Sequence, residues 1–286
     1  MPISTGTITE MVKNCAGVVS ETVAAIKTDI IEAPIVHFDE TGSRVEGKTN
    51  WAHVASTSEL TYITIEEKRG QKGMDNAGIL PSFKGTGIHD CYGSYFAYDE
   101  VRHGLCCAHV LRELNGVREN YDQEWADEMS DLFIYMKARK EFLIQQGRYE
   151  ASKDDLEICS KCYDEIIAQA QELNPFHEDT SNKKGRPKRG KVGSLVDRLD
   201  LRKDQWLLFF TDFAVPFDNN QAERDFRFFK VKQKVSGCFR TSDGADNFAA
   251  IMSFIGTARK RGLSVFSAIK NALLGNSFYL ISPATE

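Results

Sequence analysis

Three short segments of the chain carry carboxylates in settings that suit metal-dependent chemistry on a phosphodiester. They are Ile35-Val-His-Phe-Asp39-Glu-Thr, Gly87-Ile-His-Asp90-Cys-Tyr-Gly and Asp218-Asn-Asn-Gln-Ala-Glu223-Arg. Each of the first two places an Asp at the end of a short β-like apolar run, and the third places a Glu on a basic helix. Three such carboxylates can hold a pair of Mg²⁺ ions against a nucleic acid. Because the chain contains 41 acidic residues, this spacing alone does not identify a site.

Positive charge is concentrated in two segments, although the net charge of the 286-residue chain is −5. A helix after Glu223 would place Arg227, Lys230 and Lys234 on the face of that carboxylate. The other segment, residues 183–191, contains six cations: Lys183, Lys184, Arg186, Lys188, Arg189 and Lys191. Cations beside a carboxylate cluster suit DNA binding, whereas the alternative for either segment is a solvated surface.

Composition and length limit the class of protein. The length predicts about two domains, or one domain with a large insertion. Hydrophobic residues make up 42% and charged residues 27%, as in ordinary globular proteins. No apolar run approaches the roughly 18–20 residues that span a bilayer, and the first residues lack a secretory pattern. We therefore expect a cytoplasmic protein without membrane contact, and its seven cysteines agree with a reducing compartment.

The pattern of apolar residues predicts the elements that position both aspartates. A helix over residues 8–30 precedes three strands rich in β-branched and aromatic residues, at 35–39, 49–57 and 60–65. These form an antiparallel meander with a turn at Glu46-Gly47. A short helix within 66–78 then permits a fourth strand, Thr86–Asp90, to lie parallel beside the first.

Helical patterns dominate the chain after Asp90. Apolar stripes over 107–117, 125–136, 156–170 and 195–210 predict core helices. The polar, basic segment 175–193 predicts a loop or linker. Asp218 predicts the N-cap of the helix that carries Glu223, with Gln221 three residues later.

Longer motifs around these segments resemble the transposases of the IS66 insertion-sequence family. The motifs are His37-Phe-Asp39-Glu-Thr-Gly, Trp51-Ala-His-Val-Ala-Ser-Thr, Gly78-Ile-Leu-Pro-Ser-Phe-Lys-Gly, His103-Gly-Leu-Cys106-Cys-Ala-His109-Val-Leu-Arg-Glu-Leu, Val215-Pro-Phe-Asp-Asn-Asn-Gln-Ala-Glu223-Arg and Lys234-Val-Ser-Gly-Cys-Phe-Arg. The similarity extends from about Thr5 to Gly275. The order of Asp, Asp, helical insertion and Glu is that of ribonuclease H-like nucleotidyl transferases with a DDE triad.

This resemblance implies an α/β fold, with a ribonuclease H-like mixed sheet flanked by helices and interrupted by an all-helical insertion. It implies that Asp39, Asp90 and Glu223 are catalytic ligands of Mg²⁺, for which Mn²⁺ can substitute. We expect Asp39 to bridge two ions, because an Asp on the first strand, at the centre of the sheet, can reach both. Double-stranded DNA, as transposon ends and target, would be the substrate. The expected assembly is a homo-oligomer on DNA, with accessory transposition proteins as further partners.

The same resemblance implies a division of the chain into a lead-in helix (1–34), the first part of the catalytic domain (35–114), a helical insertion (115–210) and a second catalytic part (211–286). Family members carry a longer N-terminal DNA-binding region than the 38 residues before Asp39. We therefore expect a catalytic fragment, or a second protein that reads the transposon ends. Cys91 also replaces the Gly that the family pattern has after Asp90.

Several other residues have two interpretations. Possible zinc ligands are Cys106, Cys107 and His109, with His103 nearby, and the pair Cys159 and Cys162. Zinc needs four convergent ligands, so buried packing is favoured over zinc. For Cys106 and His109 we expect a structural role at the junction with the insertion.

Polar residues near the acidic segments are also ambiguous. His37 would share the strand face of Asp39, as a partner of the site or a core histidine, whereas His89 would point away from Asp90. Asn219 and Asn220 either contact the DNA backbone or only shape the start of the helix.

Three alternative functions remain open from the sequence. The chain could be a stand-alone metal-dependent nuclease, which would cleave DNA without joining it. It could be an inactive DNA-binding fragment of a decayed element, which would bind DNA without turnover. It could also be a regulatory partner of a full-length transposase, which would form mixed oligomers and show no activity alone.

Overall fold

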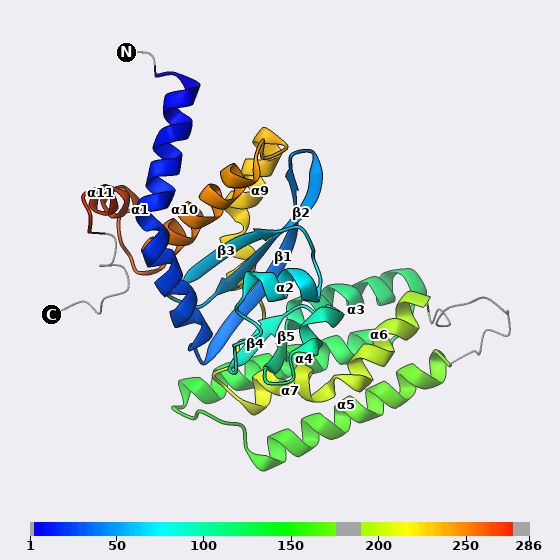
Figure 1. The fold of residues 1–286 in the computed structure, drawn as a ribbon. Coiled ribbons are helices and arrows are strands. Elements are labelled where there is room, and N and C mark those ends of the chain that lie inside the picture. The colour runs from blue at the N-terminus through cyan, green and yellow to red at the C-terminus, as the bar shows by residue number, and fades with distance from the viewer. Residues whose placement is uncertain (1–2, 176–189, 277–286) are drawn as a thin grey trace. The chain divides into compact units, whose positions relative to one another are not determined.

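The computed structural model describes residues 3–175 and 190–276, which form two compact units. Among the described residues, unit 1 combines 3–103 and 219–276, and unit 2 combines 104–175 and 190–218. Figure 1 shows a sheet with its helices in unit 1 and a group of helices in unit 2. No helix of the described residues is long and apolar enough to cross a membrane.

Unit 1 is a mixed α/β structure built on a five-stranded sheet. The strands are β1 (Ile35–Val45), β2 (Lys48–Ser56), β3 (Thr61–Glu66), β4 (Thr86–His89) and β5 (Arg102–Leu105), in the order β3-β2-β1-β4-β5. β1, β2 and β3 pair antiparallel, and β4 lies parallel to β1. The predicted meander and the predicted parallel fourth strand are therefore confirmed, whereas β5 was not predicted.

The turn between β1 and β2 lies where the sequence predicts it. Glu46 and Gly47 both have positive φ, 52° and 75°. Two positive φ angles in a two-residue loop are typical of the type I′ turn, whose twist matches the flanking strands. The turn fixes the register of β1 against β2, and with it the face on which each β1 side chain lies.

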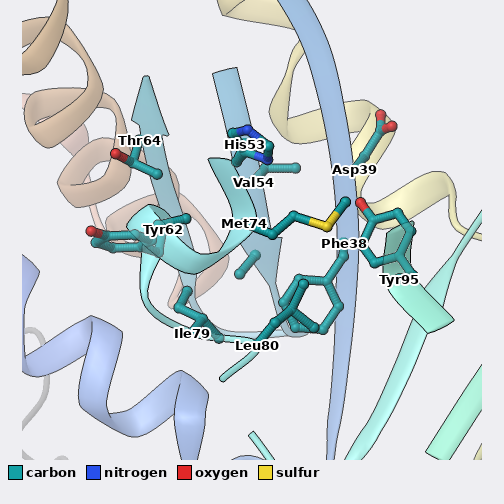
Figure 2. A pocket seen from close by; sticks show the side chains of 12 residues that line it. Phe38, Asp39, His53, Val54, Tyr62, Thr64, Met74, Ile79, Leu80 and Tyr95 are labelled. Atoms are coloured by element: carbon teal, nitrogen blue, oxygen red, sulfur yellow. The ribbon is translucent and has the colours of Figure 1, made fainter. Parts of the chain in front are cut away.

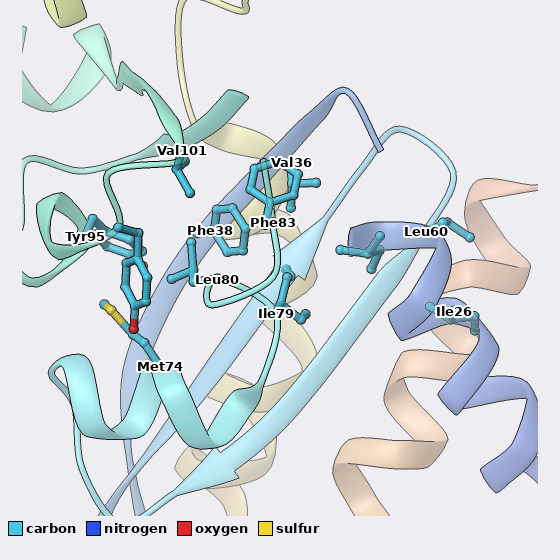
Figure 3. Packing of buried hydrophobic residues seen from close by; sticks show 13 residues of the cluster. Ile26, Val36, Phe38, Leu60, Met74, Ile79, Leu80, Phe83, Tyr95 and Val101 are labelled. Atoms are coloured by element: carbon cyan, nitrogen blue, oxygen red, sulfur yellow. The ribbon is translucent and has the colours of Figure 1, made fainter. Parts of the chain in front are cut away.

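One face of the sheet is covered by α1 (Thr5–Ile31), α2 (Gln71–Ala77), the residues after α2 and the 3₁₀ helix η1 (Gly93–Ala97). Figure 3 shows Phe38 of β1 packed among Met74, Leu80 and Tyr95 on this side. The cluster is apolar apart from the tyrosine hydroxyls, so burial of this face holds β1 and β4 in place.

The opposite face is covered by α8 (Asn220–Asp225), α9 (Arg227–Ser236) and α10 (Ser242–Lys260). Val54 and Ile63 of the sheet pack against Phe226 and Phe229 of these helices. A Cβ atom on Gly256 would lie 2.8 Å from Cβ of Thr61, so only glycine permits α10 to approach β3 this closely. α11 (Val265–Leu273) packs on α1 and α10 through Ala268 and Ala272.

Unit 2 consists of five helices in its described residues: α3 (Cys107–Tyr121), α4 (Trp125–Gln145), α5 (Lys153–Leu173), α6 (Gly190–Leu201) and α7 (Lys203–Thr211). Phe133 and Trp206 are fully buried in its interior. The predicted loop 175–193 is wrong at its end, because helix α6 already begins at Gly190. Val192 and Leu195 are buried, so packing favours a helical start in spite of the polar sequence. Residues 176–189 lie outside the described chain.

Candidate active site

Asp39 projects from the face of the sheet that α8 covers. Along β1, buried and partly exposed residues alternate, with Phe38 and Glu40 on one face and His37 and Asp39 on the other. Asp39 pairs in register with Val54, which belongs to the same buried cluster as Ala222 of α8. Directly paired residues point to the same face, so Asp39 and α8 lie on the same side of the sheet.

Asp90 lies beside Asp39. The parallel register pairs His37 of β1 with Ile88 of β4, and its continuation by two residues brings Asp90 next to Asp39. The backbone N–H of Tyr92 donates to Oδ1 of Asp90 over 3.0 Å, which fixes the carboxylate in the turn after β4. The crossover through α2 thus brings together two aspartates that are far apart in sequence.

The charge state of Asp39 reflects this crowding. Burial is the largest cause that raises its pKa, to about 7, and the negative charges of Glu40 and Asp90 raise it further. A hydrogen bond from the backbone N–H of Glu40 (2.9 Å) and the nearby ammonium of Lys230 act in the opposite direction. A raised carboxylate pKa beside a second carboxylate is typical of sites that bind cations.

The side chain of Asn219 connects the start of α8 to β1 by hydrogen bonds. The side-chain amide of Asn219 donates to the carbonyl of Phe38 (2.7 Å), and its Oδ1 lies 2.9 Å from Nδ1 of His37. Asn219, and not Asp218 as predicted, is the N-cap residue, and its side chain does not cap the helix. The prediction is wrong because the tertiary bonds to β1 take the place of a local capping bond. His37 shares the face of Asp39, as predicted.

Asp225 connects the other end of α8 to the sheet and to α10. Its Oδ2 accepts hydrogen bonds from Ser56 (2.7 Å) and Thr61 (3.0 Å), and an ion pair from Lys260 of α10 (2.7 Å). The Lys260 ammonium also donates to the carbonyl of Leu60 at 2.6 Å. Both side chains of the ion pair are nearly buried, at 12% and 10% exposure. Glu223 therefore lies on a short helix held at both ends.

Glu223 is half-buried on α8, on the same side of the sheet as Asp39. Within residues 3–175 and 190–276, however, no group of three or more His, Cys, Asp or Glu side chains could hold a metal ion. The structure brings Asp39 and Asp90 together and does not join Glu223 to them in such a group. Joint ligation by all three carboxylates stays a prediction.

A second acidic residue, Glu40, supports the site from the opposite face of β1. Its carboxylate accepts hydrogen bonds from the hydroxyl of Tyr95 (2.6 Å) and from Nε of Arg69 (2.9 Å). Burial raises the pKa of Glu40, while these two hydrogen bonds lower it. The Arg69 guanidinium lies over the rings of Trp51 and Tyr92, at 5.1 and 4.2 Å.

Our sequence reasoning missed Glu40, Arg69 and Tyr95. The one available signal was strand alternation, which places Glu40 on the core face of β1, where a carboxylate needs partners. Nothing in the polar segment around Arg69 identified that partner.

A small pocket lies on this same face, as Figure 2 shows. Met74, Ile79 and Leu80 close it, and the carboxylate of Asp39 points away from these side chains. Its volume of about 20 Å³ holds a single water molecule at most. The pocket is part of the core and is too small for a substrate.

The cations that the sequence predicts to bind DNA lie on α9, on α6, or outside the described residues. Arg227, Lys230 and Lys234 are exposed on α9, and the charge of Lys230 acts on Asp39. Lys191 is exposed in the first turn of α6. The remaining cations of that segment, Lys183, Lys184, Arg186, Lys188 and Arg189, lie outside the described residues.

Cys106 and His109 lie at the start of unit 2. Cys106 is fully buried and is the N-cap residue of α3, and His109 is in the first turn of this helix. The thiol of the neighbouring Cys107 points to the carbonyl of Trp206 at 3.8 Å. Cys106 and His109 therefore lie among packed helices.

The fold and the site together define an α/β protein with a pair of neighbouring carboxylates. Its mixed sheet brings two aspartates together beneath the short helix α8, and the next helix, α9, carries exposed cations. The model of the Transposase IS66 family matches residues 1–247. The chain belongs to this family, so the resemblance of its motifs is confirmed and its function is of the transposase type, with DNA as the partner. A comparison with curated proteins gave no match.

The family implies dependence on a divalent metal, and the donor set of this site fits one. Asp39 and Asp90 offer hard carboxylate oxygens, which Mg²⁺ and Mn²⁺ prefer. The raised pKa of Asp39 indicates a buried negative charge that a cation would stabilise.

This fit predicts how pH affects the stability of the protein without added metal. Because the pKa of Asp39 is raised from 3.8 to about 7, the folded state binds more protons than the unfolded state within this window. Stability should therefore fall as pH rises from 5 to 8, by an amount on the order of a few kcal/mol. Added Mg²⁺ should stabilise the protein more at pH 8 than at pH 5, because protons compete for the carboxylate.

Urea unfolding at both pH values, with and without Mg²⁺, measures this effect. Asp39→Asn should remove most of the Mg²⁺ stabilisation, while Asp99→Asn, on an exposed carboxylate of the same unit, should keep it. Equal stabilisation by Mg²⁺ at pH 5 and pH 8 would contradict a metal site at Asp39.

Proposed function

We propose that the protein is a DNA transposase of the DDE type, in which Asp39, Asp90 and Glu223 hold Mg²⁺ or Mn²⁺. The observation that carries the proposal is the placement of Asp39 beside Asp90, under the helix that bears Glu223. The sheet supports a ribonuclease H-like domain, since β1 to β3 form an antiparallel meander and β4 runs parallel to β1. In this proposal unit 2 is the helical insertion.

Divalent ions at this site would activate the attacking hydroxyl or water and stabilise the leaving oxygen. The residues of the chain supply the positioning. Asp39, central on the sheet, would hold the ions together with Asp90 and Glu223. Asn219 and Asp225 hold α8, so Glu223 has little freedom to move away from the DNA strand.

The substrate is double-stranded DNA, first the transposon end and then the target. Lys230 lies close enough to Asp39 to influence its charge, so a DNA strand at the carboxylates would also meet α9. We propose that Arg227 and Lys234, on the same side of the helix, contact neighbouring phosphates. A homo-oligomer bound to two transposon ends, with accessory proteins where the element encodes them, is the expected assembly.

A cleavage and joining assay tests the proposal. The DNA that flanks the gene supplies the terminal inverted repeats for labelled substrates, which are incubated with the protein and Mg²⁺, Mn²⁺ or Ca²⁺. We expect cleavage at the repeat end and strand-transfer products with Mg²⁺ and Mn²⁺. Cleavage without joined products would indicate a nuclease. Binding without turnover would indicate an inactive or regulatory protein.

The cations of α9 should contribute to affinity without sequence preference. Each of Arg227→Ala, Lys230→Ala and Lys234→Ala should weaken DNA binding and reduce the slope of log affinity against log salt by about one unit, because one phosphate contact is lost. Lys232→Ala is the control, since the ammonium of Lys232 lies 5.1 Å from the ring centroid of Phe239 on another side of α9. Unchanged affinity and slope in all three variants would remove α9 from the DNA interface.

A further inference from the structure

A hollow lies between α8, the start of α9 and α10, apart from the carboxylates. Gln221, Arg224 and Phe228 line one side, and Met252, Gly256 and Arg259 line the other. Its volume is about 270 Å³. The buried pair of Asp225 and Lys260 lies at its base, so the hollow has a fixed floor.

The hollow is on a different side of α8 and α9 from Glu223 and Lys230. Gln221 and Arg224 of α8 and Phe228 of α9 follow one another at steps of three and four. Phe226, which joins the two helices, is itself in the αR conformation, so the three residues lie on one side. Glu223 and Lys230 lie on another face, and the buried Ala222, Phe226 and Phe229 lie on a third. A ligand in the hollow would therefore not occupy the carboxylate site.

The charge of the hollow is positive and uncompensated. Arg224 and Arg259 are both exposed, and neither forms a salt bridge within the described parts of the chain. The only carboxylate that lines the hollow is Asp225, which already pairs with Lys260. Two guanidinium groups that line the same hollow without a carboxylate partner form a natural site for a phosphate.

The hollow also offers an aromatic surface. Phe228 is 47% exposed, and the guanidinium of Arg259 lies over its ring at 4.2 Å. Met252 adds a polarisable, apolar side chain beside it. An exposed phenylalanine next to two arginines that lack a carboxylate partner suits a ligand that carries both a phosphate and a flat aromatic group, as a nucleotide does.

We propose that this hollow binds an unpaired nucleotide of the DNA substrate, with its phosphate between Arg224 and Arg259 and its base against Phe228 and Met252. The nucleotide must be unpaired, because in a duplex both base faces are covered by neighbouring bases. The proposal rests on the proposed DNA transposase function and adds a second DNA contact, specific for single-stranded or opened DNA.

Binding measurements by fluorescence anisotropy in EDTA test the proposal without any cleavage. The probes are a blunt duplex, the same duplex with a short single-stranded tail, and the tailed duplex with abasic sites in the tail. The wild-type protein should prefer the tailed duplex over the blunt and abasic probes. Phe228→Ala should lower affinity for the tailed duplex by about 5- to 100-fold and leave the blunt duplex unchanged.

Further variants separate the contributions of ring and charge. Phe228→Tyr, which keeps the ring, should bind as the wild type does, and Arg224→Ala should weaken binding of the tailed duplex only. Phe266→Ala on α11, where the phenylalanine is 78% exposed, is the matched control and should change nothing.

Each other outcome overturns the proposal in a distinct way. Equal loss on blunt and tailed duplexes would make the hollow a contact for the duplex backbone. Equal affinity for the abasic and normal tails would show that no base binds. Tight binding of a free nucleoside monophosphate that Phe228→Ala abolishes, without a preference for tails, would assign the hollow to a small molecule.

The two proposals fail in different ways. If the wild type binds no DNA at all, the proposed function itself fails. Intact DNA binding with no effect of Phe228→Ala rejects only the proposal for the hollow.

Discussion

Asp39→Asn is expected to abolish metal-dependent strand cleavage and to leave DNA affinity unchanged. The substitution removes one negative charge from the paired aspartates and no phosphate contact, so it acts on metal binding alone. The loss should exceed the roughly 10- to 100-fold that follows from removing a residue that only orients a metal ligand. Cleavage of a labelled transposon end with Mg²⁺, beside anisotropy in EDTA, measures both quantities.

Two further variants make this result specific. Asp90→Asn should reproduce the loss, since Asp90 lies next to Asp39 in the parallel register of β1 and β4. Asp99→Asn should cleave as the wild type does, because its carboxylate is exposed after η1. Full activity of Asp39→Asn would remove the carboxylate pair from the mechanism.

Lys260→Met should destabilise unit 1 by about 3–5 kcal/mol, because it leaves the nearly buried carboxylate of Asp225 without its cation. Methionine is unbranched and reaches as far as Cε of lysine, so the effect reports the lost ammonium more than lost packing. Urea unfolding measures the change. Lys161→Met, which breaks an exposed pair with Glu165, is the control and should cost about 1 kcal/mol or less.

The double variant Asp225→Asn/Lys260→Met separates an ion pair from simple loss of contacts. If the cost of Lys260→Met comes from the uncompensated carboxylate, neutralising Asp225 should restore a large part of the stability. A double variant whose loss equals the sum of the two single losses would mean that the two side chains act independently.

Local patterns predicted the presence of β1 to β4 because their signals are short-range, whereas β1 continues to Val45, beyond the predicted residues 35–39. Alternation along β1 placed His37 and Asp39 on one face, and the turn at Glu46 and Gly47 was recognisable from glycine and spacing. The four residues of β5 have no such alternation, and its place at the edge of the sheet follows from packing on β4. The strand was therefore missed.

The contacts that hold α8 could not be predicted, because they join residues far apart in the sequence. The bonds of Asn219 to β1 join residues 181 and 182 positions apart, and those of Asp225 to Ser56 and Thr61 join residues 169 and 164 positions apart. A polar residue such as Asn219 fits a helix cap from local sequence alone, and only the fold reveals the alternative partner. For the same reason, periodicity predicted the helix that carries Glu223 but could not predict the distance between Glu223 and Asp39.

The two layers that cover the sheet are made at different times during synthesis. α1, α2 and η1, which cover one face, are encoded next to the strands, whereas Lys260 of α10 contacts the carbonyl of Leu60 from 200 residues further along the chain. At about 5–20 residues per second, translation takes roughly 10–40 s to bridge this interval. Until α8, α9 and α10 are synthesised, Val54 and Ile63 have no partners from these helices, and the nascent sheet presents an apolar face to the ribosome and to chaperones. A ribosome that stalls within unit 2 would thus release a sheet with one uncovered side, a species prone to aggregation and proteolysis, and the yield of complete transposase would depend on the speed of elongation as well as on the stability of the finished fold.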